Sequence, residues 1–306
     1  MTLFRDETVV LDGGLATELA ARGYDISGAL WSARLLRSAP EAIGQLHYDY
    51  YAAGARIAIT ASYQASYEGF AAAGIDAAET TRLLRVSVEL ARNARARYRR
   101  DHPDDRRELF VAASVGPYGA ISHDGAEYRG DYGLPVDQLV DFHARRFGEL
   151  ATSGAEFLAC ETIPVLDEAR AYVELLNRHA GARAWLSFTS PDGIHTSHGE
   201  LLADCARLLD RVSNVIAVGV NCVKPEHVGA AIRALQAGTE KPIVVYPNSG
   251  ETWDSRDESW RGVPGSETLA ALVPGWIAAG ARLVGGCCRV GPRDIAGMAR
   301  AVAAGP

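Results

Sequence analysis

AAGARIAI at residues 52–59, TSGAEFLA at 152–159 and AAGARLVG at 278–285 are three versions of one junction. Each version follows a stretch in which apolar residues have helical spacing, and each precedes a short run of apolar and β-branched residues. The glycine in the third position closes a helix, because glycine accepts the left-handed backbone angles found just beyond a helix C-terminus. The junction therefore predicts repeated passages from a helix into a strand.

The rest of the chain continues this alternation of strands and helices. We predict strands over 9–14, 56–63, 109–116, 156–162, 184–190, 215–222, 242–248 and 282–288. Amphipathic helical stretches are predicted over 41–53, 79–100, 136–152, 166–179, 200–211, 226–237, 267–279 and 292–303. Alternating units of this kind imply a parallel sheet with right-handed crossovers, and eight of them favour a closed (β/α)8 barrel of the TIM type. An open doubly wound sheet is the alternative, which the lack of a dinucleotide glycine fingerprint after the first strand weakens.

Composition limits what the protein does. The chain has 306 residues, and we find no interior linker, so residues 1–306 are expected to form one domain. A net charge of −7 argues against nucleic acid or an anionic membrane surface as a partner. Neither a membrane-spanning apolar run nor a signal peptide is found, which predicts a cytoplasmic protein. We expect a monomer or a small homo-oligomer.

In a barrel of this kind the active site lies at the C-terminal ends of the strands. The chemistry-bearing residues predicted at those ends are Asp12, Thr60, Ser62, Ser114, Glu161, Asn221, Cys222, Asn248, Cys287 and Cys288. Two long connections, 116–135 and 248–266, are expected to cover this end and carry the aromatic residues Tyr118, His123, Tyr128, Tyr132, Trp253 and Trp260. His195 and His198 are interpreted as loop residues rather than metal ligands.

The adjacent pair Cys287–Cys288 is the most informative feature of these ends. On a regular strand the two side chains would point to opposite faces, so both thiols reach one point only if the strand ends there. Gly285 and Gly286 are expected to permit that turn. With Cys222 from the sixth strand, the pair then forms a three-thiolate site with an open fourth position, which suits zinc.

Two other interpretations of these cysteines remain open. They could be small buried apolar residues, or Cys287 and Cys288 could form a redox-active vicinal disulfide. Cys160 and Cys205 are interpreted as structural. A three-thiolate zinc site favours attack by a bound thiolate on a carbon electrophile, such as the methyl group of a sulfonium, and is less suited to metal-assisted hydrolysis.

The polar residues predict the other half of an amino-acid site. Asp12 and Glu161 are expected to bind an ammonium group, with the backbone amides of Gly13 and Gly14 taking the carboxylate. The alternatives are that Asp12 caps the following helix and that Glu161 forms a salt bridge at the rim. Further substrate contacts are assigned to Thr60, Ser62, Asn221 and Asn248; Asn248 could equally fix a turn.

The stretches VLDGGLATEL, LWSARLL, GVNC, YPNSGE and GGCCRVGP together resemble homocysteine S-methyltransferases across nearly the whole chain. The resemblance implies a zinc-dependent barrel that transfers a methyl group to homocysteine and produces methionine. It implies that Cys222, Cys287 and Cys288 bind zinc and that Asp12 and Glu161 bind homocysteine.

The family has branches that use different methyl donors. DGGLATEL, LWSA and YPNSGE resemble most closely the branch that uses S-methylmethionine, and often S-adenosylmethionine. A betaine-dependent enzyme and a selenocysteine methyltransferase are the alternatives within the family. Outside it, the alternative is a non-catalytic zinc-binding or redox-sensing barrel.

Overall fold

The computed structural model describes most of the chain: residue 4 and residues 7–27, 30–121, 125–254, 259–261 and 268–305. Of residues 31, 32, 252–254, 259 and 260 only the backbone is described. His123 of the predicted aromatic set lies outside the described residues, as do the side chains of Trp253 and Trp260.

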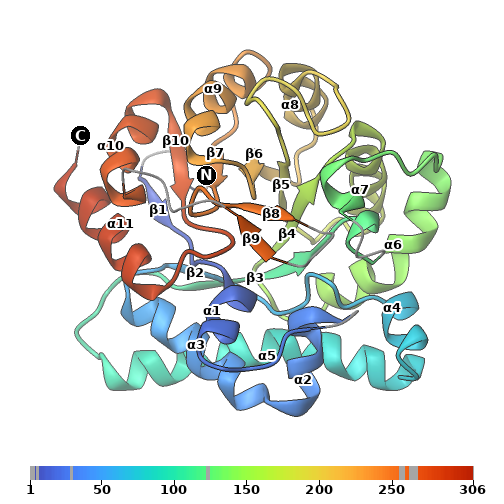
Figure 1. Ribbon diagram of the computed structural model, residues 1–306, viewed down its shortest axis with the longest axis horizontal. Coiled ribbons are helices and arrows are strands. Elements are labelled where there is room, and N and C mark those ends of the chain that lie inside the picture. Colours follow the sequence, from blue (N-terminus) through green and yellow to red (C-terminus); the bar gives the residue numbers. More distant parts are fainter. Residues whose placement is uncertain are drawn as a thin grey trace.

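Eight parallel strands form one sheet in the order β1-β10-β7-β6-β5-β4-β3-β2. They are β1 (Val9–Val10), β2 (Ile57–Ile59), β3 (Phe110–Val115), β4 (Phe157–Ile163), β5 (Ala184–Phe188), β6 (Val215–Asn221), β7 (Ile243–Tyr246) and β10 (Ala281–Val284). The sheet curves until its two outer strands meet (Figure 1). At this seam Leu11 and Ile57 form a parallel bridge, and the N–H of Arg56 donates to the carbonyl of Val10 at 2.7 Å. The predicted (β/α)8 barrel is confirmed.

Helices surround the barrel and follow the predicted alternation (Figure 1). The main ones are α3 (Pro40–Ala52), α5 (Ala77–Asp101), α6 (Val136–Ala151), α7 (Leu166–Arg178), α8 (Leu202–Asp210), α9 (Pro225–Gln236), α10 (Leu269–Ala279) and α11 (Pro292–Ala304). At the three repeated junctions, Gly54, Gly154 and Gly280 have positive φ angles of 110°, 89° and 115°. These values confirm the predicted reason for glycine at the helix ends.

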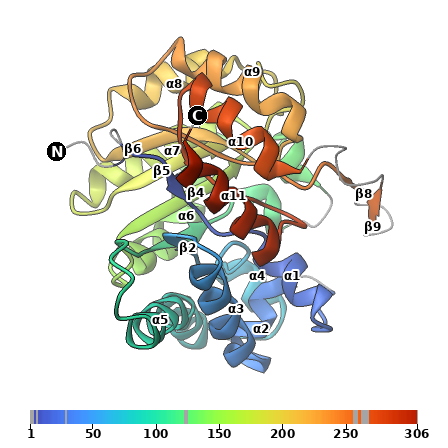
Figure 2. The ribbon, with the colours of Figure 1, turned by 90° about the vertical axis from the view of Figure 1, so that its left-hand side faces the viewer.

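Several short elements were not predicted from the sequence. They are α1 (Leu15–Ala21), α2 (Leu35–Ser38), α4 (Tyr67–Ala72), the 3-10 turns η1 (Trp31–Arg34), η2 (Tyr118–Ile121) and η3 (Ala126–Tyr128), and the hairpin of β8 (Thr252–Asp254) and β9 (Ser259–Arg261). Each is too short for its apolar residues to show a clear period. All of them lie in connections that follow a strand, and the hairpin projects from the body of the barrel (Figure 2).

The apolar side chains form two buried layers. One fills the space between the sheet and the helices. The other fills the inside of the barrel and includes Leu11, Phe157, Trp185, Val244 and Leu283. Because the inside is packed with side chains, a substrate can bind only above it, at an end of the barrel.

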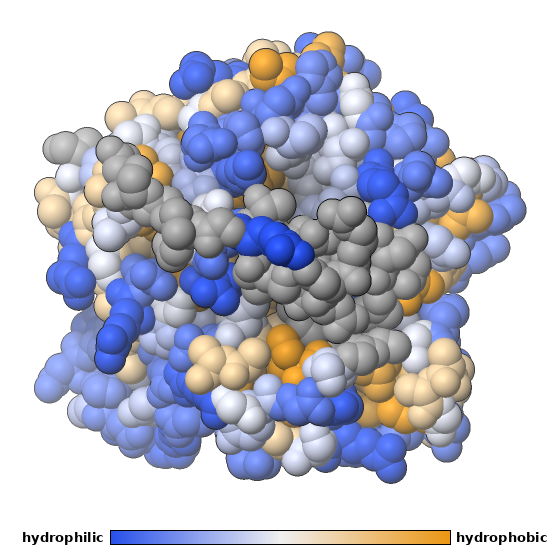
Figure 3. Space-filling view, viewed as in Figure 1, coloured by the Kyte–Doolittle hydropathy of each residue, from blue (hydrophilic) through white to orange (hydrophobic). Residues whose placement is uncertain are grey.

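Hydrophilic residues are spread around the periphery of the face shown in Figure 3. Within the described part of the chain, no helix combines the length and the apolar character needed to cross a membrane.

The close contact between β6 and β7 allows the packing of the barrel to be tested. A Cβ atom added at Gly219 in β6 would collide with the backbone carbonyl of Val244 in β7, which cannot move without displacing the strand. We expect Gly219→Ala to lower the free energy of unfolding by about 1–3 kcal/mol, as overpacking does. Gly275→Ala in α10 is the matched control: its Cβ would meet no atom within 4 Å, and we expect a gain of about 0.5–1 kcal/mol. Equal effects in urea unfolding would contradict the packing described here.

Candidate active site

A cavity of about 680 Å³ lies at the C-terminal ends of the strands. Eight of the residues predicted for the site line it, namely Gly13, Gly14, Thr60, Glu161, Asn221, Cys222, Cys287 and Cys288. Three others, Asp12, Ser62 and Asn248, are buried beside it and are not among the described residues that line it. Such a volume is in the usual range for small-molecule sites.

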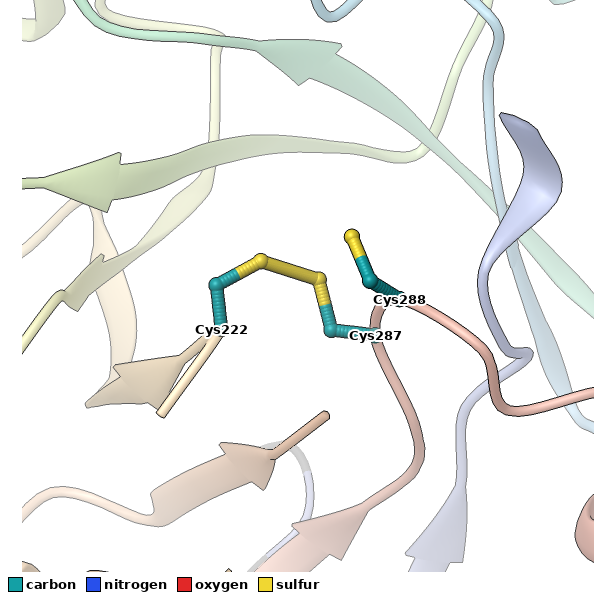
Figure 4. A group of neighbouring side chains, drawn as sticks. All are labelled: Cys222, Cys287 and Cys288. Atoms are coloured by element: carbon teal, nitrogen blue, oxygen red, sulfur yellow. A yellow bond between two sulfur atoms is a disulfide. The ribbon is translucent and has the colours of Figure 1, made fainter. Parts of the chain in front are cut away.

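The three cysteines meet as the sequence predicted. Cys222 directly follows β6, and Cys287 and Cys288 lie beyond the end of β10; their side chains point toward one another (Figure 4). The three sulfur atoms all lie within 4.8 Å of one another. Cys222 and Cys287 are half-buried and Cys288 is 7% exposed. A single small ion or molecule can therefore contact all three.

The backbone beyond β10 explains how neighbouring cysteines share one point. The strand ends at Val284, and Cys287 donates its N–H to the carbonyl of Pro247 at 2.7 Å. Gly285 and Gly286 do not have positive φ angles, which corrects the predicted reason for them. They are needed because other residues approach closely: a Cβ on Gly285 would lie 2.6 Å from the Cβ of Leu11. The left-handed residues here are Cys222, with φ 51°, and Arg289, with φ 61°.

In this structure Cys222 and Cys287 form a disulfide, and Cys288 is free. The predicted alternative of a vicinal disulfide is therefore not what is found, because Cys287 pairs across the strands instead. Metal ligation requires both sulfurs in the reduced, thiolate form. Around a tetrahedral zinc ion with Zn–S distances near 2.3 Å, the sulfurs would lie about 3.8 Å apart. Once the Cys222–Cys287 bond is reduced, the three sulfurs, which all lie within 4.8 Å of one another, can take up such distances.

Asn248 connects the segments that carry the cysteines. Its backbone N–H donates to the carbonyl of Val223 at 3.0 Å, next to Cys222. Its side-chain Oδ1 accepts the N–H of Cys288 at 3.1 Å. Asn248, just beyond β7, thus connects the two cysteine-bearing segments, and its side chain makes a long-range contact instead of the predicted local turn.

Asp12 is a buried carboxyl group with an unused oxygen. Its Oδ2 accepts the N–H of Ile59 at 2.7 Å, so it does not cap α1. Its Oδ1 has no hydrogen-bond partner among the described residues. Burial, and to a smaller extent the charge of Glu161, raise the pKa of Asp12 well above its usual value. A cationic group placed here would restore its ionised form.

Glu161 lies at the end of a chain of hydroxyl groups. Ser114 donates its hydroxyl to Oε1 of Glu161, and the N–H of Ser114 donates to Thr60 Oγ1 at 3.1 Å. Thr60 and Ser62 share a hydrogen bond of 2.7 Å. Burial raises the pKa of Glu161 to about 7, although hydroxyl groups of Ser114 and Tyr246 act in the opposite direction. Thr60 and Ser62 are thus connected to Glu161 through Ser114.

Asn221 uses its side chain within the protein. Its Oδ1 accepts the N–H of Thr162 at 2.7 Å and the hydroxyl of Ser187 at 2.7 Å, and its Nδ2 donates to Thr162 Oγ1 at 2.8 Å. Thr162 has a φ of 62°, a strained value for a β-branched residue. Asn221 therefore holds the backbone that follows Glu161.

Gly14 also makes a contact within the protein, because its N–H donates to the carbonyl of Val290 at 2.9 Å. This bond uses the amide that was predicted to bind a substrate carboxylate. A Cβ on Gly14 would meet the carbonyl of Cys287. Gly14 therefore allows a close approach between the segments that follow β1 and β10.

Some of the lining residues were missed by sequence reasoning. They are Tyr63, Glu127, Thr162, Tyr246 and Arg289; Tyr128, from the predicted aromatic set, also lines the cavity. Three of them had a local signal: Thr162 directly follows Glu161, Tyr246 begins the stretch YPNSGE, and Arg289 directly follows Cys288. His195 and His198 lie in the loop after β5, where each ring contacts a carboxylate, Asp192 and Glu200 respectively.

Comparison with known proteins gives consistent results. A family model described as homocysteine S-methyltransferase matches residues 9–302. Homocysteine S-methyltransferase YbgG of Bacillus subtilis (strain 168) is 47% identical over 289 residues, which are 94% of this chain and 92% of that protein. Homocysteine S-methyltransferase of Escherichia coli (strain K12) is 48% identical over 298 residues, or 97% and 96% of the two chains.

A solved structure is similar over the same length. The metallated form of the homocysteine methyltransferase MmuM from Escherichia coli matches with a TM-score of 0.88 and 47% identity, covering 97% of both chains.

The grouping of the three sulfurs generates a test of metal binding. We expect Cys222→Ser, Cys287→Ser and Cys288→Ser each to abolish stoichiometric zinc binding in reduced protein, because each removes one of three thiolate ligands. Zinc per chain is measured by mass spectrometry after removal of excess metal. Cys205→Ala is the control, since Cys205 is buried in α8 and not part of the group. Full zinc occupancy in any of the three serine variants would rule out that cysteine as a ligand.

Proposed function

The chain belongs to the homocysteine S-methyltransferase family, and from that premise we propose that it transfers a methyl group from a sulfonium donor to the thiol of homocysteine. The donor we propose is S-methylmethionine, with S-adenosylmethionine as a second substrate. One bond breaks, between the donor sulfur and its methyl carbon, and one forms, between that carbon and the homocysteine sulfur. The thiol proton is released, and both sulfur products are neutral thioethers.

One observation carries this proposal: three grouped sulfur atoms and two buried carboxyl groups, Asp12 and Glu161, lie at the same end of the barrel. We propose zinc as the ion held by Cys222, Cys287 and Cys288. When bound, zinc lowers the pKa of a ligating thiol, so that homocysteine is a thiolate at neutral pH. The protein alone does not favour thiolates here, because burial raises the pKa of Cys288 to about 12.

The two carboxyl groups have a matching role in binding homocysteine. Both are buried, and both have raised pKa values in the absence of a cation. The ammonium group of an amino acid would satisfy the free oxygen of Asp12 and neutralise part of this charge. Because Thr60, Ser62 and Ser114 brace Glu161, its carboxylate is oriented before the substrate arrives.

The cavity is large enough for both substrates at once. Its volume of about 680 Å³ is several times that of one small amino acid. Binding both together allows direct transfer without a methylated enzyme, and holding the thiolate and the methyl group in line accelerates the reaction by proximity. We propose that the protein works in the cytoplasm, where a reducing environment keeps its cysteines as thiols.

The donor assignment is tested by methionine formation from homocysteine with reduced, zinc-loaded protein. S-methylmethionine, S-adenosylmethionine and betaine are supplied in parallel. We expect turnover with the sulfonium donors and none with betaine. Turnover with betaine alone would overturn the donor assignment. No turnover with any donor, at one zinc per chain, would favour the non-catalytic alternative.

The role of Glu161 predicts a pH dependence. Its pKa of about 7 means that it is neutral below pH 7 and becomes able to pair with an ammonium group as the pH rises. We expect Glu161→Gln to lower kcat/KM for homocysteine by about 10- to 100-fold above pH 8, the range for a hydrogen bond to a charged group. The loss should shrink toward pH 6, so the ratio of wild-type to variant kcat/KM is measured from pH 6 to 9. A constant ratio would contradict this role.

A further inference from the structure

Arg289 occupies a position that favours glycine. It directly follows Cys288, and its φ of 61° lies in the left-handed region. Its N–H donates to Thr17 Oγ1 at 2.8 Å, which holds the backbone in this shape. Since glycine would fit here without strain, the arginine side chain itself needs an explanation.

The guanidinium of Arg289 is fixed along one edge. Its Nε donates to Oε2 of Glu251, a residue only 6% exposed, and Ser249 donates its hydroxyl to the same oxygen at 2.9 Å. Among the described residues, the two terminal nitrogens of Arg289 have no acceptor. The side chain is 43% exposed and lines the cavity. One edge is therefore anchored while the other remains available to a ligand.

Arg289 is also the one positively charged side chain among the described residues that line the cavity. The carboxyl groups in the same lining are Asp25, Glu127 and Glu161. An anionic ligand group therefore has a single charged partner in this lining. A guanidinium presents parallel N–H groups that match a carboxylate better than an ammonium does.

We propose that Arg289 binds the α-carboxylate of the methyl donor and so selects a sulfonium that carries an amino-acid group. This inference rests on the proposed function, because it assumes a sulfonium donor. The donor must place its methyl group at the homocysteine sulfur, next to the cysteines. The Cα atoms of Arg289 and Cys288 are about 3.8 Å apart. In S-methylmethionine three carbons separate the sulfonium from the carboxylate, so the long side chain of Arg289 can reach that carboxylate.

Homocysteine also has a carboxylate, but burial argues against its being the group bound by Arg289. Asp12 is 1% exposed and Glu161 is 7% exposed, so an ammonium that pairs with them lies deep in the site. Arg289 is much more exposed and lies toward solvent. The methyl donor, which enters after homocysteine and binds nearer to solvent, is therefore the substrate that contacts Arg289.

The test compares donors with and without the carboxylate at saturating homocysteine. S-methylmethionine is compared with its decarboxylated analogue, (3-aminopropyl)dimethylsulfonium. We expect Arg289→Gln to lower kcat/KM for S-methylmethionine by about 10- to 100-fold, mainly through KM. With the decarboxylated donor the loss should be less than twofold. Arg289→Lys should recover part of the activity with S-methylmethionine only.

Arg293→Gln is the matched control, because it removes the same charge from an exposed position four residues further on. Arg289→Gly, which relieves the backbone strain, guards against misfolding of the glutamine variant. Equal losses with the two donors would overturn the proposal. The proposal would also be overturned if the loss caused by Arg289→Gln disappeared when 3-aminopropanethiol, which lacks a carboxylate, replaced homocysteine. Wild-type protein that is inactive with every sulfonium would refute the proposed function itself, whereas active wild-type protein with equal losses refutes only the role of Arg289.

Discussion

The site depends on one geometric constraint: three sulfur atoms from two separate strands must meet within 4.8 Å. In the sheet, β7 lies between β6 and β10, so its end is positioned to set the distance between the cysteine-bearing segments. Pro247 and Asn248, just beyond β7, hydrogen-bond to Cys287, Cys288 and the residue after Cys222. Because parallel strands of a closed barrel cannot slide independently, this arrangement is as rigid as the sheet itself.

A second constraint is the cost of buried negative charge. Asp12, Glu161 and three thiolates would together place several negative charges in a partly dehydrated space, which is costly. Burial accordingly raises the pKa of Asp12, Glu161 and Cys288. The hydroxyl groups around Glu161 only partly offset this cost. Cations must supply the rest, and the proposed reaction provides three: the metal ion, the homocysteine ammonium and the sulfonium. The buried carboxyl and thiol groups thus indicate that the proposed ligands of this site are cationic.

The two halves of the site rest on different kinds of structure. The groups assigned to the metal and homocysteine are at strand ends, where the barrel fixes them. Other residues that line the cavity, including Glu127 and Tyr128 of η3, are carried by connections between elements. Connections change more easily than strands, so one barrel can keep its acceptor chemistry while its donor differs.

The sequence by itself determined the barrel, because eight strand–helix alternations and the repeated glycine junctions are local patterns that need no tertiary information. It also identified the three cysteines and two carboxyl groups, since strand ends of a barrel converge. Only the tertiary structure showed that Gly285 and Gly286 serve close packing, that Gly14 and Asn221 bond within the protein, and that Arg289 faces the cavity. Such roles depend on which atoms approach from distant parts of the chain. The residues adjacent in sequence do not indicate which distant atoms will approach.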